Sequence, residues 1–162
     1  MNIKHTDKYT YLGNVFNEKN NMKDHITHIN GKVEAAYQTI MTMTGNPEFR
    51  NIEMEIIWKL VETCIQPITT YAGETWNTTK KEKEEINRIT DKIIKRILMT
   101  PPTTPRETLY IETGLLDNEY LIAKNRVNMQ SRLNVTQNEL IKTARESGNK
   151  GGWEEITELT RK

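Results

Sequence analysis

The side chains best suited to chemistry in this sequence are cationic, and they cluster in one stretch of the chain. In residues 79–99 seven Lys and Arg residues outnumber four acidic residues, although the whole chain carries a net charge of only +1. On a helix of 3.6 residues per turn, several of these cations share one side. Such a side could contact phosphate groups of nucleic acid without reading the base sequence, although an ordinary solvated helix face is the alternative interpretation. The candidate contact residues are Lys81, Arg88, Lys92, Lys95 and Arg96.

Other reactive side chains form no recognisable active site. His25 and His28 lie three residues apart, but a closed metal site needs about four ligands, so we expect surface histidines and no metal. Cys64 follows Ile56 and Leu60 on an apolar stripe and is expected to be buried rather than nucleophilic. The sequence has no glycine-rich phosphate loop and no Gly-x-Ser-x-Gly elbow. We therefore expect no catalytic residue, no cofactor and no enzymatic activity.

Composition places the chain in a reducing compartment and away from membranes. A single cysteine cannot form an internal disulfide bond. The first ten residues are polar, and no apolar run approaches the roughly 18 residues that span a bilayer. The expected location is intracellular, in the cytoplasm or the nucleus.

The elements that would carry these residues are mostly helices. Residues 9–16 are rich in aromatic and β-branched side chains and favour a strand or hairpin, but no partner strand is evident. Residues 24–44 have apolar side chains at steps of three and four, which predicts a helix ending before Gly45. A second helix is expected from a cap at Asn51, and Pro67 makes the segment 65–76 either a kinked continuation of it or a second short helix.

Capping signals define the later helices. Thr79 and Glu82 form a capping-box pattern that opens a helix, and the prolines after residue 100 end it. Thr104 is expected to cap a short helix with Pro105 at its first position, and Asp117 to cap the next. The fold class predicted is mainly α, a bundle of five to six helices with a short N-terminal strand or hairpin leader. The predicted divisions are the leader at 1–20, the helical bundle at 21–133 and a polar tail at 134–162 that is expected to be flexible.

The order of several motifs resembles the region that follows the palm in LINE-type (non-LTR) retrotransposon reverse transcriptases. The leader residues Tyr11-Leu12-Gly13 resemble the family's primer-grip hairpin. Downstream, the segment 67–76 resembles its Pro-x-x-x-Tyr-Gly-x-Glu-x-Trp signature, but Ala72 stands at the family's glycine position. The residues that match this signature are Pro67, Tyr71, Gly73, Glu74 and Trp76. The resemblance covers roughly residues 3–130.

This resemblance implies a thumb and connection region that packs against a template–primer duplex. The family's catalytic metals are held by aspartates of the palm, and this sequence contains no Asp-Asp pair. The implied partners are an RNA–DNA or DNA duplex, bound weakly by this chain alone, and the missing palm domain. The alternative is a helical protein-interaction or self-association module that forms homo-oligomers.

Overall fold

The computed structural model describes residues 6–19, 21–45, 52–136 and 138–139. The described residues are mainly helical and begin with a two-stranded antiparallel hairpin, as predicted. The chain divides into two compact units, the first comprising Met1–Tyr71 and Thr78–Asn118 and the second Ala72–Asn77 and Glu119–Lys162. Among the described residues, no helix combines the length and apolarity needed to cross a membrane.

The hairpin joins β1 (Lys8–Tyr11) to β2 (Asn14–Asn17). Its two turn residues, Leu12 and Gly13, both have positive φ, at 47° and 83°. Positive φ at both turn residues is typical of a type I′ turn, whose twist matches that of the paired strands. Glycine and asparagine are usual in such turns. The expectation that the leader lacks a partner strand was therefore wrong, because its second half pairs with its first.

Helix α1 (Lys23–Thr44) matches the predicted span within one residue. Its apolar stripe is buried, with Ile29, Val33 and Ile40 at 4% exposure or less. The stripe follows the spacing of three and four residues that places side chains on one face. This face packs on the later helices and forms one wall of the core.

The second helix is irregular, as expected from Pro67. It runs through α2 (Met54–Leu60), a π-helical segment (Val61–Ile65) and α3 (Gln66–Thr70). A proline lacks the N–H that continues an α-helix, and its ring crowds the preceding turn, so the widened turn before Pro67 accommodates it. The helix begins after Glu53, and the predicted cap Asn51 lies outside the described residues.

Cys64 is exposed, which corrects the prediction that it is buried. The side of the helix that faces the core carries Val61 and Ile65, both 0% exposed, whereas Ile56 is 49% exposed. Positions four apart stack on one face, so the buried stripe is displaced by one residue from the one that contains Cys64. Two stripes of similar apolarity run along this helix, and only the packing decides between them.

Helix α4 (Lys80–Ile97) begins at the predicted capping box, which is confirmed: the Thr79 hydroxyl accepts from the Glu82 N–H, and the Glu82 carboxylate accepts from the Thr79 N–H. The same carboxylate accepts the Met22 N–H at 3.0 Å, which joins the starts of α1 and α4. These hydrogen bonds, chiefly those from Thr79 and Met22 N–H, lower the pKa of Glu82 against the opposing effect of its burial.

The two last helices begin near the predicted positions. Helix α5 (Arg106–Thr113) starts one residue later than expected, with Pro105 at its cap position. The Thr104 hydroxyl donates to the Pro101 carbonyl at 2.8 Å instead of capping the helix, so that prediction was wrong. Helix α6 (Asn118–Val135) starts directly after Asp117.

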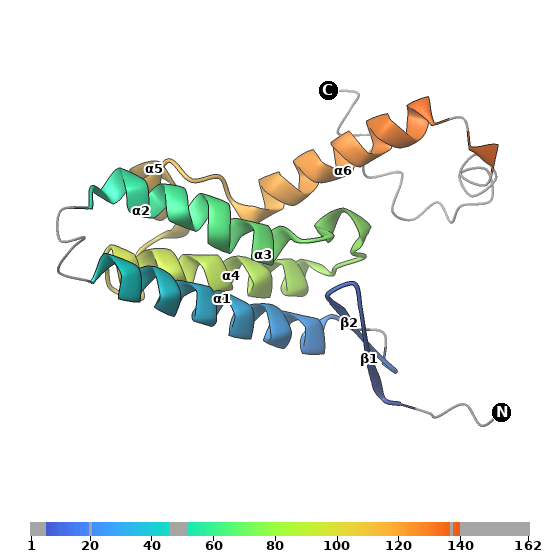
Figure 1. Cartoon of the computed structure of the whole chain (residues 1–162), viewed down its shortest axis with the longest axis horizontal. Coiled ribbons are helices and arrows are strands. Elements are labelled where there is room, and N and C mark those ends of the chain that lie inside the picture. The colour runs from blue at the N-terminus through green and yellow to red at the C-terminus, as the bar shows by residue number, and fades with distance from the viewer. Residues whose placement is uncertain (1–5, 20, 46–51, 137, 140–162) are drawn as a thin grey trace. The chain divides into compact units, whose positions relative to one another are not determined.

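Within the first unit, α1 and α4 run in the same direction, and the α2–α3 helix runs opposite to both (Figure 1). Helix α5 packs on α4, and the hairpin packs on the start of α1 through β2. β-branched apolar residues from α1, the π-helical segment and α4 fill much of the space between these elements. The most deeply buried side chains include Val33, Ile65, Ile86, Ile93, Ile94 and Leu109.

Candidate functional site

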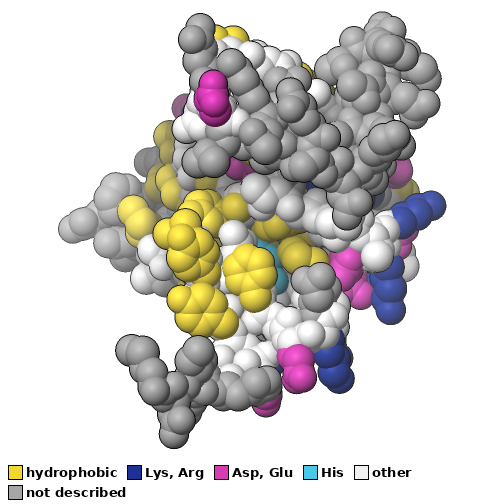
Figure 2. Space-filling model, turned by 90° about the vertical axis from the view of Figure 1, so that its right-hand side faces the viewer, with side chains coloured by type: hydrophobic (Ala, Val, Ile, Leu, Met, Phe, Trp, Pro, Cys, Tyr) yellow, Lys and Arg dark blue, Asp and Glu magenta, His cyan; other side chains and the backbone are white. Residues whose placement is uncertain are grey.

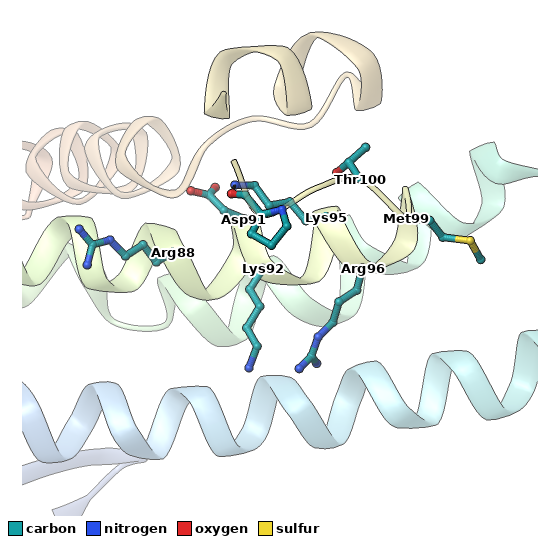
Figure 3. Close-up of a pocket in the computed structure, with 8 residues that line it drawn as sticks. Arg88, Asp91, Lys92, Lys95, Arg96, Met99 and Thr100 are labelled. Carbon is teal, nitrogen blue, oxygen red and sulfur yellow. Dashed lines mark hydrogen bonds between the residues drawn. The ribbon is translucent and has the colours of Figure 1, made fainter. Parts of the chain in front are cut away.

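The C-terminal half of α4 and the loop that follows it surround a hollow of about 600 Å³ in the first unit (Figure 3). Four of its lining side chains are cationic and one is acidic. The lining residues are Arg88, Asp91, Lys92, Lys95, Arg96, Met99, Thr100 and Pro102. We call this surface the basic hollow.

Core packing on the opposite side of α4 orients these cations. Ile93 and Ile94 are at most 1% exposed, so the helix is fixed with its cationic side outward. Met99 then adopts a left-handed backbone conformation, with φ of 52°, and ends the helix. This turn brings the loop back over the last helical turn, where Lys95 Nζ donates to the Pro102 carbonyl at 2.6 Å. Lys95 is thereby held at the edge of the basic hollow.

Two of the cations point from α4 towards α1 (Figure 3) and meet a single carboxylate there. Glu34 on α1 accepts from Lys92 Nζ at 2.6 Å and from an Arg96 guanidinium nitrogen at 2.5 Å. The guanidinium of Arg96 also lies 5.5 Å from the centroid of the Tyr37 ring. The hydrogen bond from Lys92, and then the one from Arg96, lower the pKa of Glu34, so its carboxylate stays ionised and pairs with both cations.

The other two cations are less neutralised. The Arg88 side chain is 75% exposed, and its guanidinium lies 3.9 Å from Glu84, at the outer limit of an ion pair. Lys95 bonds a neutral carbonyl. Burial raises the pKa of the Asp91 carboxyl, and the nearby positive charge of Lys95 offsets part of this effect.

A polar cluster lies behind Asp91 and joins α4 to α5. The Tyr110 hydroxyl donates to the Asp91 carboxylate at 3.0 Å, and the Arg106 guanidinium lies 3.6 Å from the same oxygen. Burial and the neighbouring Asp91 charge both raise the pKa of Tyr110. The Tyr110 hydroxyl therefore stays protonated and remains a donor, and the cluster fixes the side of the basic hollow that faces α5.

The structure brings together four of the five predicted contact residues. Lys81 is the exception, because it lies exposed in the first turn of α4, seven residues or about 10 Å before Arg88 along the helix axis. Sequence reasoning missed Glu34, whose partners are 58 and 62 residues away in the chain. No local pattern marks a carboxylate for so distant a pair. It also missed the loop residues that close the basic hollow.

The predicted primer-grip-like residues form the tip of the hairpin. Leu12 is 69% exposed, and the Tyr9 and Tyr11 rings stack with centroids 6.5 Å apart. A Cβ added to Gly13 would lie 3.4 Å from the Tyr71 ring, so Tyr71 packs beside the turn. Apolar side chains gather at this end of the first unit (Figure 2). The tip is thus an exposed apolar surface rather than a buried turn.

The segment that matches the family signature spans both units. Pro67 and Tyr71 belong to the first unit, and Gly73, Glu74 and Trp76 to the second. In the second unit Trp76 is buried at 8% exposure, and its carbonyl accepts from Arg126 of α6 at 2.6 Å.

Ala72 has a left-handed backbone, with φ of 56°, at the position where the family has glycine. Left-handed φ is disfavoured for any residue with a Cβ. Glycine would therefore fit the backbone conformation of this turn better than alanine does.

His25 is buried at 3% exposure, which corrects the expectation of a surface histidine. Its Nδ1 accepts the Val15 N–H at 3.2 Å and so ties the hairpin to α1. Burial, followed by the nearby His28 and Lys32, lowers the pKa of His25 and favours the neutral ring that this acceptor role requires. Among the described residues, no group of three or more His, Cys, Asp or Glu side chains could hold a metal ion.

Searches against protein-family models, curated proteins and solved structures found no match to this chain. The resemblance to LINE-type reverse transcriptases therefore depends on the order of the motifs in the sequence. The basic hollow and the exposed hairpin are the two surfaces on which a function can be argued.

Proposed function

We propose that this chain is a non-catalytic helical module that binds the sugar–phosphate backbone of a nucleic-acid duplex through the basic hollow. The observation that carries the proposal is the convergence of Arg88, Lys92, Lys95 and Arg96 on one concave surface. Cationic side chains on a rigid helix are suited to phosphate groups, because such contacts need charge and position but no base readout.

The charges around the basic hollow favour weak, backbone-directed binding. Glu34 and Asp91 offset part of the positive charge, and the whole chain is close to neutral. Each cation that does reach a phosphate releases counterions, so affinity should fall steeply with salt. The proposed partner is an RNA–DNA or DNA duplex.

The motif order supports a thumb-like role within this proposal. In the family that the sequence resembles, the corresponding region contacts the template–primer duplex beside a palm that holds the catalytic metals. The palm domain is therefore a second proposed partner. Without an Asp-Asp pair of its own, the chain would bind nucleic acid but not extend a primer.

Neutralising the two less restrained cations tests the proposal. In Arg88→Gln/Lys95→Gln, we expect affinity for a fluorescein-labelled RNA–DNA duplex to fall about tenfold at low salt, with a salt slope shallower by about two. Fluorescence anisotropy measured at several salt concentrations gives both quantities. Neither substitution leaves Glu34 without its partners, because Glu34 pairs with Lys92 and Arg96.

A matched variant separates the basic hollow from total charge. Lys23→Gln/Lys32→Gln removes the same charge from two exposed positions of α1 that do not line the basic hollow. This control should bind like the unaltered protein. Equal losses in the two double variants would mean non-specific attraction, and no binding of the unaltered protein at low salt would refute the proposed function.

The exposed hairpin favours a second function, self-association. The apolar residues Tyr9, Tyr11, Leu12 and Phe16 are each at least 53% exposed. Within the described residues the sheet has only two strands, and β2 packs on α1 with its Val15 N–H donating to His25 Nδ1, so the open edge is that of β1. Open edges with apolar side chains favour pairing with another strand, and a second copy of this chain would supply one.

Sedimentation velocity tests self-association. If the hairpin pairs between copies, a dimer should appear at high micromolar concentration, and Tyr9→Ser/Tyr11→Ser should shift it at least tenfold towards monomer, because both apolar rings are lost. Ile111→Ser is the control, since Ile111 is 80% exposed on α5, away from the hairpin. A monomer at every concentration would exclude this function.

A further inference from the structure

The carboxylate of Glu34 pairs with two cations of the basic hollow that a bound phosphate would need. It accepts from Lys92 at 2.6 Å and from Arg96 at 2.5 Å, two residues one helical turn apart on α4. Two anionic oxygens bridging two cations in this way make the same charge-assisted hydrogen bonds that a phosphate diester would make. In this structure, two of the four cations of the basic hollow are therefore already paired with the Glu34 carboxylate.

The cations would remain in place if Glu34 were displaced. Arg96 is also held by the face of the Tyr37 ring, 5.5 Å from its guanidinium carbon. Lys92 is half exposed and can turn towards solvent or a ligand. The backbone of α4 is fixed by its buried isoleucines and does not depend on these ion pairs. Removal of Glu34 from its partners would thus leave Arg96 held beside Tyr37, and Lys92 able to reach a ligand, on an intact helix.

The exposure of the pair makes exchange with a ligand feasible. The side chain of Glu34 is 28% exposed, and those of Lys92 and Arg96 are 50% and 38% exposed. Ion pairs with this access to water contribute little net stability, because hydration competes with them. A polyanion that brings several phosphates at once can therefore compete with one carboxylate.

We infer that Glu34 is an intramolecular competitor of the phosphate backbone, and that it restrains nucleic-acid binding by holding Lys92 and Arg96. The inference depends on the proposed function, since it concerns the regulation of the same site. Duplex binding then includes an exchange step in which Lys92 and Arg96 leave the carboxylate and contact phosphate.

The test compares Glu34→Gln with the unaltered protein in anisotropy titrations on the same RNA–DNA duplex. Glutamine keeps the length of the side chain and removes its charge. We expect affinity to rise about tenfold at low salt, because the duplex no longer has to displace a carboxylate before Lys92 and Arg96 contact phosphates. Glu62→Gln is the matched control, since Glu62 lies on the π-helical segment, pairs with Lys59 of α2 and does not line the basic hollow.

The outcomes distinguish this inference from the proposed function. If the unaltered protein binds and Glu34→Gln binds no better than Glu62→Gln, the competitor role is wrong and the binding function stands. If only Glu34→Gln binds, the competitor role is supported, whereas the binding function proposed for the unaltered protein fails. If neither binds at low salt, the proposed function fails, and the inference fails with it. A gain that persists in Glu34→Gln/Lys92→Gln/Arg96→Gln would also overturn the inference, because the released cations would then be irrelevant.

Discussion

Replacing Asn118 by leucine is expected to lower the free energy of unfolding by about 2 kcal/mol, because it leaves the buried Thr90 hydroxyl without the amide that donates to it. Asn118 is 0% exposed at the junction between the loop after α5 and the start of α6. Its side-chain oxygen accepts from the Thr69 hydroxyl at 3.0 Å, and its side-chain nitrogen donates to the Thr90 hydroxyl at 2.9 Å. One amide thus joins α3 to α4 in the core of the first unit.

The expected loss comes from the group left behind rather than from the amide itself. Leucine is also branched at Cγ, but it cannot accept from Thr69 or donate to Thr90, each of which is 0% exposed. The Thr69 hydroxyl keeps its hydrogen bond to the Gln66 carbonyl at 2.9 Å, so the Thr90 hydroxyl is the group that loses its partner. A buried polar group without a partner costs about 1–3 kcal/mol, which accounts for the estimate. Urea unfolding followed by circular dichroism gives the difference in free energy between the two proteins.

Two further variants make this prediction specific. Asn125→Leu changes an exposed residue of α6 in the same way and should alter stability by less than about 0.5 kcal/mol. Adding Thr90→Val to Asn118→Leu should recover part of the loss, because the hydroxyl that lost its donor is then absent. A loss for Asn118→Leu no larger than that for Asn125→Leu would show that the buried amide is unimportant.

Local signals predicted the parts of the fold that local interactions determine. The capping box at Thr79 and Glu82 and the turn-forming Gly13 act over a few residues, so the sequence alone located α4 and the hairpin. The choice between the stripes of Cys64 and Val61 depends on what packs against the helix. For that reason it could not be predicted from periodicity.

For the candidate site too, the sequence predicted what lies on one helix and missed what depends on packing between helices. Arg88, Lys92, Lys95 and Arg96 share a helix, so helical geometry placed them together. Glu34 reaches them only because α1 and α4 lie side by side in the same direction, which no single-helix pattern contains. The burial of His25 likewise follows from the packing of β2 on α1. Long-range packing thus decides how much of the positive charge is available.

Replacing Gly73 by alanine is expected to destabilise the second unit by about 1–3 kcal/mol, because the site has no room for a side chain. A Cβ built on Gly73 would lie 2.7 Å from Cγ1 of Ile122 on α6, closer than carbon atoms approach in folded proteins. Ile122 is branched at Cβ, which restricts its rotamers, so the methylene cannot easily move away. The helix must shift or the turn must open.

Two glycine substitutions elsewhere provide controls for Gly73→Ala. Gly31→Ala lies within α1, where an added Cβ meets nothing within 4 Å, and should stabilise the chain by up to about 1 kcal/mol. A double variant, Gly73→Ala/Ile122→Ala, should lose less than the sum of the two single changes, because the clash disappears. Urea unfolding measures the energies, and amide hydrogen exchange of α6 reports which unit responds. Gly73→Ala with unchanged stability would contradict the contact.

At the neighbouring position, Ala72, glycine is expected to stabilise the second unit. The two substitutions together test the family signature. Ala72 has φ of 56°, so Ala72→Gly should stabilise the turn by about 1 kcal/mol by relieving the left-handed backbone. If Ala72→Gly gains stability and Gly73→Ala loses it, both positions favour glycine, one for its backbone and the other for its lack of a side chain. The glycine that the family has at position 72 would then fit this turn, and Ala72 would be a strained replacement. If Ala72→Gly loses stability instead, the turn differs from the one that the family pattern implies, and the most specific part of the resemblance no longer supports a thumb.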